Sequence, residues 1–269
     1  MKLVLWIVLL CGAGLLPSES CALTEGDYTY TVSGGKATIT DFNSAYSGDL
    51  SIPSALGGYP VTSIASYAFA GCSGLKSVAV PDSVTSLGDG VFQNCGGMTN
   101  AVVGGGGGLS IGYCAFYGCS HLKSVTIGNG VESIGAQAFY GCDSLAGVAI
   151  PDSVRSIGEF AFYGCGSLAG VMIGGGVASI GGYAFSGCDS LTGVYFKGDA
   201  PGLGSSVFSG DDNVTVYRLS GATGWPTVPE LWEGRPTALW NGIVSFVVAV
   251  SVGTGGGGTV SGGGTYVSG

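Results

Sequence analysis

The chain of 269 residues contains 54 glycines but only 8 basic and 17 acidic residues, and 46% of its residues are hydrophobic. This apolar share excludes an intrinsically disordered chain, and the lack of a three-residue glycine period excludes collagen. A net charge of −9 argues against binding to nucleic acid, and a single histidine, His121, leaves little imidazole for catalysis.

Residues 1–22 have the pattern of a secretory signal peptide. Lys2 precedes an apolar run over residues 3–16, and Ser20-Cys21-Ala22 fits a small-x-small cleavage motif. The run is shorter than the ~20 apolar residues of a transmembrane helix. We therefore expect export to the medium or the cell surface, a mature start near Leu23 and no membrane span in the mature chain. Lipidation of a cysteine is the rival interpretation, but neither cysteine in this region follows a good lipobox.

Residues 23–60 predict an N-terminal β cap. Residues 28–32 and 37–40 are rich in β-forming side chains and flank Gly34-Gly35, which predicts a hairpin. Residues 50–52 have the pattern of a strand from a degenerate unit before the first complete repeat. Such a cap is expected because the open end of a stacked repeat needs cover.

Residues 61–221 contain six full repeats and a degenerate seventh. Phenylalanines recur every 23 residues apart from one step of 24, and cysteines follow them at a constant spacing. A unit this short cannot bury a core alone, so the units must stack. The two ladders comprise Phe69, Phe92, Phe116, Phe139, Phe162, Phe185 and Phe208, and Cys72, Cys95, Cys119, Cys142, Cys165 and Cys188.

Each unit predicts one strand and one turn. In Leu75-x-x-Val78-x-Val80 the alternation places both valines inward, and successive copies are expected to pair as a parallel sheet. The other half, Ser-Ile-Gly-x-x-Ala-Phe-x-Gly-Cys, is interpreted as a tight turn with one short helical turn. Its phenylalanines then form the spine of the core, and the end rings, Phe69 and Phe208, are expected to have a neighbour on one side only.

The clearest copy of the repeat, residues 150–171, reads IPDSVRSIGEFAFYGCGSLAGV. It resembles the BspA-like leucine-rich repeat, and the resemblance extends over about residues 61–220. The resemblance implies a curved solenoid. Together with the strand and turn of each unit, this predicts a leucine-rich-repeat-like solenoid with a parallel sheet on the concave side and turns with short helical turns opposite. The resemblance also implies secreted or surface-attached proteins that serve adhesion and interaction, without implying a shared ligand.

Two segments follow the repeats. In the seventh unit Asp211 takes the cysteine position, where we expect the charge to lie at an exposed end. Residues 222–242, with three tryptophans, resemble the family's aromatic C-terminal cap. Residues 243–269 combine a short apolar run with a glycine-rich stretch and resemble the start of an internalin-B-type repeat, a partial β module. Because that module is incomplete, we expect a truncated chain.

The remaining polar residues do not form a recognisable catalytic or metal motif. The ladder cysteines should all point the same way, which suits buried free thiols better than disulfides. Cys114 lies off the ladder, no Cys-x-x-Cys occurs, and His121 falls at a surface turn position. Common hydrolase motifs are also absent. We therefore expect no catalytic activity, no cofactor and no metal.

The outward strand positions form the predicted binding surface. They are small and nearly uncharged, and they comprise Ser77/Ala79, Asn100/Val102, Ser124/Thr126, Gly147/Ala149, Gly170/Met172 and Gly193/Tyr195. The candidate partner-binding residues are Ser124, Thr126, Met172 and Tyr195. The last two are the expected hot spots, because Met and aromatic side chains are enriched at interface cores.

The sequence thus predicts a monomeric, exported, surface-associated protein that binds a protein or glycan. Two alternatives stay open. In the first, the solenoid is a structural spacer or stalk. In the second, it is the non-catalytic targeting arm of a larger exported enzyme.

Overall fold

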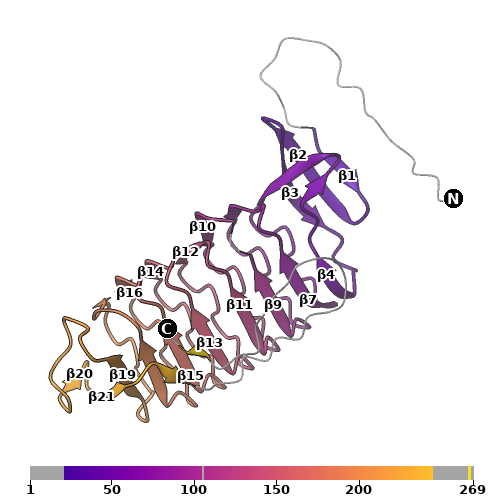
Figure 1. Cartoon of the computed structure of the whole chain (residues 1–269). Helices are drawn as coiled ribbons and strands as arrows, with labels where there is room; N and C mark the ends of the chain where they lie inside the picture. The colour runs from indigo at the N-terminus through magenta and orange to yellow at the C-terminus, as the bar shows by residue number, and fades with distance from the viewer. Residues whose placement is uncertain (1–20, 105, 245–265, 268–269) are drawn as a thin grey trace.

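The computed structural model describes residues 21–104, 106–244 and 266–267, and in it the chain winds into a β-solenoid of stacked coils (Figure 1). Each complete coil is one repeat unit and carries a long strand and a short strand joined by turns. The architecture confirms the repeat solenoid predicted from the 23-residue period. The predicted signal peptide lies outside the described residues, apart from Cys21 and Ala22.

The long strands of successive coils pair in parallel, as predicted. Val148 of β13 lies opposite Val171 of β15, which lies opposite Val194 of β17, and all three are buried. These strands form two consecutive sheets, β4 to β11 and β13 to β21, whose outward side we call the long-strand face. The strands are β4 (Gly48–Ser51), β7 (Leu75–Val80), β9 (Asn100–Val103), β11 (Ser124–Ile127), β13 (Gly147–Ile150), β15 (Gly170–Ile173), β17 (Gly193–Phe196), β19 (Thr215–Leu219) and β21 (Arg235–Trp240).

The other half of each coil was predicted as a tight turn, and this prediction is wrong in part. It contains a short strand, and the short strands of successive coils form a row. Ser156 and Ile157 pair in parallel with Ser179 and Ile180 of the next coil. Strands of two to four residues show too little alternation for a sequence pattern to reveal them. They are β8 (Ser86–Leu87), β10 (Leu109–Ile111), β12 (Val131–Ile134), β14 (Ser156–Ile157), β16 (Ser179–Ile180) and β18 (Gly202–Leu203).

The segment after each short strand contains turns, and no helical turn is found in the described residues. Around Phe185 the backbone is left-handed at Tyr183 (φ 56°) and Gly187 (φ 72°), and such residues cannot continue a right-handed helix. The amides bond instead to the next coil, as Phe162 N does to Ala184 O at 2.7 Å. We call this side the turn edge; it comprises residues 65–74, 88–97, 112–121, 135–144, 158–167, 181–190 and 204–213.

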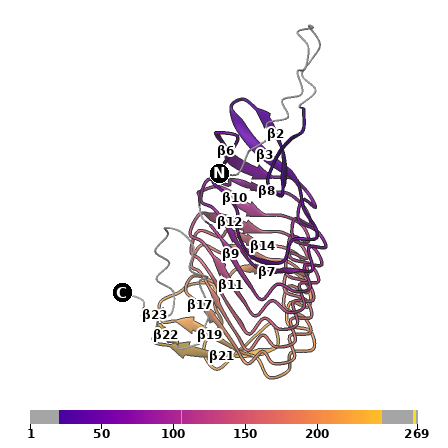
Figure 2. The ribbon, with the colours of Figure 1, turned by 90° about the vertical axis from the view of Figure 1, so that its right-hand side faces the viewer.

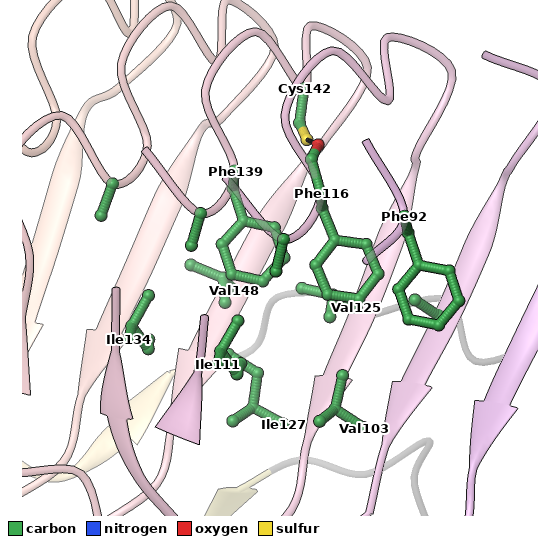
Figure 3. Close-up of a cluster of buried hydrophobic side chains, with 14 of the residues drawn as sticks. Phe92, Val103, Ile111, Phe116, Val125, Ile127, Ile134, Phe139, Cys142 and Val148 are labelled. Atoms are coloured by element: carbon green, nitrogen blue, oxygen red, sulfur yellow. Dashed lines mark hydrogen bonds between the residues drawn. The ribbon is translucent and has the colours of Figure 1, made fainter. Parts of the chain in front are cut away.

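The seven ladder phenylalanines stack in one column through the core, part of which Figure 3 shows. Neighbouring ring centroids lie 5.0 to 5.2 Å apart from Phe69 to Phe185, and 5.9 Å separates Phe185 from Phe208. The expectation of a single neighbour is wrong for Phe69, because the centroid of Phe42 lies 4.7 Å away on the cap side. The N-terminal cap therefore extends the core.

The N-terminal cap contains the predicted hairpin. Strands β2 (Tyr28–Ser33) and β3 (Lys36–Phe42) pair antiparallel around Gly34 and Gly35, which both have positive φ angles. Strand β1 (Leu23–Glu25) pairs with β2, and β3 pairs in parallel with β6 (Tyr59–Ile64), which also pairs with β5 (Ala55–Leu56) and β8. The hairpin thereby continues the row of short strands at the end of the solenoid (Figure 2).

At the other end, β20 (Leu231–Trp232) pairs antiparallel with β21. The rings of Trp225 and Trp232 lie 4.9 and 5.4 Å from that of Phe196, so the tryptophans close the last part of the core. Strand β22 (Ile243–Val244) pairs with β23 (Tyr266–Val267). The rest of the predicted partial β module, residues 245–265 and 268–269, lies outside the described residues.

The expected exposure of Asp211 is wrong. The residue is 2% exposed, because the coil before it and the β20–β21 hairpin after it cover the cysteine position. Neither of its buried carboxylate oxygens accepts a hydrogen bond with standard distance and angle. Burial raises the pKa of Asp211 to about 6, and the nearby carboxylates of Asp189 and Asp212 add to the shift. The Cys188 backbone and the Arg235 guanidinium offset part of it.

We predict that this carboxyl makes the stability pH-dependent. Its pKa is higher in the folded than in the unfolded chain, so its stabilising contribution is complete below about pH 4 and is lost as pH rises through about 6. The Asp211→Asn variant should lack this loss, which we expect to be on the order of 2 kcal/mol. Urea unfolding between pH 4 and 8 measures it, with the exposed Asp143→Asn change as the control. An unaltered pH profile in Asp211→Asn would show that another group is responsible.

Candidate functional site

The ladder cysteines are buried free thiols. Each thiol from Cys95 to Cys188 donates a hydrogen bond to a phenylalanine carbonyl of the preceding coil, as Cys142 does to Phe116 O at 3.3 Å (Figure 3). Burial raises the pKa of Cys119 and of Cys165 to about 12. Because a thiolate is the reactive form, these thiols serve packing and not nucleophilic chemistry.

The thiol column gives a prediction for chemical labelling. At pH 8 the ladder cysteines of the folded protein should not react with a thiol reagent, because their pKa values are raised and their sulfur atoms are covered. In denaturant all of them should react. Mass spectrometry of the labelled peptides follows each ladder cysteine separately. Rapid labelling of Cys142 in native buffer would contradict the buried column.

The four candidate partner-binding residues lie on long strands but differ in accessibility. Ser124 is 6% exposed, and its hydroxyl donates to Asn100 Oδ1 at 2.6 Å. Met172 is 3% exposed, although it lies outside the phenylalanine-lined core. Thr126 and Tyr195 are half-buried. Of the two expected hot spots, Tyr195 therefore offers the accessible surface.

Tyr195 belongs to an aromatic group at the C-terminal end of the long-strand face. Its ring stacks on Tyr217, with centroids 4.6 Å apart and planes 8° apart, and Trp240 meets it edge-on at 5.5 Å. Gly193 makes room, because a Cβ there would lie 2.8 Å from Tyr195 Cε2 and Oη. Burial raises the pKa of Tyr195, and the neighbouring Tyr217 adds to the shift. We call Tyr195, Tyr217 and Trp240 the long-strand aromatic cluster.

Sequence reasoning missed two members of this cluster. Tyr217 lies opposite Tyr195 in the register of β17 and β19. The 23-residue spacing continued from Tyr195 arrives at Arg218 and misses Tyr217 by one residue. The alternation of Val214 and Val216 could have placed Tyr217 on the outward side of the last strand. Trp240 had no such signal, because its segment follows the repeats and its position depends on the pairing of β21 with β19.

The described residues offer little for other chemistry. No group of three or more potential metal-ligating side chains occurs within residues 21–104 and 106–244. His121 is exposed on the turn edge, with its Nδ1 3.3 Å from the hydroxyl of Ser120. None of the segments described forms a helix long and apolar enough to cross a membrane.

Comparisons with known proteins agree with this architecture. A family model described as a BspA type leucine rich repeat region matches residues 42–105 and 108–220 in 6 copies. The chain is 28% identical to a leucine rich cell surface protein from Faecalibacterium prausnitzii, with a TM-score of 0.66, over 78% of this chain and 57% of that one. It is 29% identical to a leucine-rich repeat protein from T. pallidum, with a TM-score of 0.51, over 71% of this chain and 78% of that one. The chain thus spans little more than half of the F. prausnitzii protein. No curated protein matches it.

Proposed function

Because the chain belongs to the BspA-type leucine-rich repeat proteins, we propose that it is an exported, surface-associated protein that binds a macromolecular partner without catalysing a reaction. The similarity to a leucine rich cell surface protein supports the location. The observation that carries the binding proposal is the long-strand aromatic cluster, because it presents half-buried rings on an ordered parallel sheet. Rigid aromatic groups of this kind dominate many protein interfaces.

The stacking of the cluster favours a protein partner over a glycan. A sugar ring packs on an open aromatic face, but Tyr195 and Tyr217 cover one face of each other at 4.6 Å. Their ring edges and hydroxyl groups remain for contact, and these combine apolar area with hydrogen bonding. A partner with an apolar surface rimmed by hydrogen-bonding groups fits this arrangement.

The test compares the full chain with its Tyr195→Ala/Tyr217→Ala variant on an array of purified extracellular proteins and on a glycan array. We expect protein partners to be retained by the unchanged chain and to bind at least about tenfold more weakly to the variant. Tyr67→Ala, which removes an exposed tyrosine from the turn edge, is the matched control. Partners that bind both variants equally would contradict the assignment to this cluster. If neither array yields a partner, the spacer interpretation replaces binding.

A further inference from the structure

A second aromatic surface lies on the turn edge. The rings of Tyr117, Tyr140 and Tyr163 stack in sequence with centroids 4.9 Å apart. Tyr163 then meets Phe160 at 5.6 Å, and Phe160 stacks on Tyr183 at 5.1 Å. Tyr183 is 37% exposed and the other four rings are half-buried, so five aromatic side chains form one continuous surface across four coils. We call these five residues the turn-edge aromatic cluster.

The backbone position of two of these rings does not require an aromatic side chain. Phe160 and Tyr183 have φ angles of 55° and 56°, in the left-handed region that disfavours residues with a Cβ. Gly90 occupies the equivalent position of an earlier coil with a φ of 59°. A glycine therefore satisfies the backbone there, and the two rings lie outside the phenylalanine-lined core. Tyr67, Cys114, Gln137 and Ser206 occupy the same position in other coils, with φ angles of 54° to 64°. The backbone there accepts several kinds of side chain, so it does not require an aromatic ring.

The charged side chains of the turn edge itself are all acidic. The turn edge, as defined by its residue ranges above, contains no Lys or Arg. Its exposed acidic side chains include Asp89, Asp143, Glu159 and Asp189. The basic residues of the repeats lie outside the turn edge, among them Lys76, Lys123, Arg155 and Lys197. Arg235 pairs with Asp212 at 3.2 Å at the C-terminal end of this edge. Among the described residues no ion pair involves Asp143, Glu159 or Asp189, so the rim beside the aromatic cluster is negative.

We propose that the turn-edge aromatic cluster and its acidic rim form a second interaction surface, which binds an arginine-rich segment of a partner protein. Guanidinium groups form charge-assisted hydrogen bonds with carboxylates and also pack against aromatic rings, which an ammonium group does less well. The apolar stems of arginine cover the ring edges between the charges. Nucleic acid is repelled by the same rim.

The proposal is independent of the long-strand aromatic cluster and can be tested with a nona-arginine peptide and a nona-lysine peptide of equal charge. Fluorescence anisotropy at low ionic strength measures binding of each to the full chain. We expect tighter binding of nona-arginine by about threefold or more. Glu159→Gln/Asp189→Asn should weaken nona-arginine binding by about fivefold or more. The control Asp27→Asn/Glu233→Gln removes two exposed carboxylates of the caps, so it has the same net charge as the test variant.

A third variant tests the rings without changing charge. Tyr163→Ser interrupts the stack, and it should reduce the preference for nona-arginine over nona-lysine. Circular dichroism confirms that each variant retains the fold. Equal losses in the two charge variants would overturn the proposal, because they would indicate diffuse attraction to an acidic protein. Equal binding of the two peptides to the unchanged chain would overturn it as well.

Discussion

Replacing Phe139 by alanine is expected to lower the free energy of unfolding by about 3–5 kcal/mol. Phe139 is fully buried, and its ring centroid lies 5.1 Å from that of Phe116 and 5.0 Å from that of Phe162. Removing the ring opens a cavity between two coils whose backbones are bonded on several sides, so the site cannot collapse to fill it. The loss combines the lost burial of the ring with the cavity term.

Urea unfolding followed by circular dichroism measures this effect. Tyr67→Ala is the matched control, since Tyr67 is 55% exposed and lies outside the column. Its unfolding free energy should change by less than about 1 kcal/mol. Similar unfolding midpoints for the Phe139 and Tyr67 variants would contradict the claim that the buried phenylalanine column stabilises the fold.

Gly135→Ala is expected to destabilise the protein by about 2–4 kcal/mol, although it adds only one methyl group. A Cβ on Gly135 would lie 2.8 Å from the carbonyl carbon and oxygen of Gly112 and 2.8 Å from Ile111 O. These atoms are backbone, so they cannot rotate away as a side chain can. Gly135 N also donates to Ile111 O at 2.8 Å, and separating the coils would break this bond.

The matched control is Gly166→Ala, because a Cβ there meets nothing within 4 Å. We expect its melting temperature to stay unchanged or to rise slightly, since alanine lowers the entropy of the unfolded chain. Thermal unfolding of both variants gives the comparison. If the melting temperature of Gly135→Ala equals that of the unchanged chain, the coils do not approach as closely as the structure places them.

Most of what could be predicted about the fold follows from the repeat spacing. Residues at one repeat position must meet the same position of the next coil, so the long strands follow from the period. The short strands do not follow, because Ser-Ile alone cannot be told from a turn. The left-handed turn positions were also hidden, since Phe160 and Tyr183 carry no signal of the kind that glycine gives.

The candidate binding residues were less predictable than the fold, because accessibility depends on neighbours outside the repeat pattern. The outward position of Tyr195 followed from strand alternation, but the low exposure of Ser124 depends on its contact with Asn100. The burial of Asp211 depends on the non-repetitive hairpin that carries Arg235. The stacked tyrosines of the turn edge could have been found, because Tyr117, Tyr140 and Tyr163 each follow a ladder phenylalanine directly.

A double-mutant cycle on the phenylalanine column tests most directly whether equivalent side chains stabilise each other from coil to coil. The cycle combines Phe116→Leu with Phe139→Leu, whose rings stack at 5.1 Å, and compares this pair with Phe69→Leu and Phe162→Leu, which are not neighbours in the column. We expect a coupling energy of about 0.5–1.5 kcal/mol for the adjacent pair and additive effects for the distant pair. Additive effects for the adjacent pair would contradict the stacked solenoid core on which the fold and both binding surfaces depend.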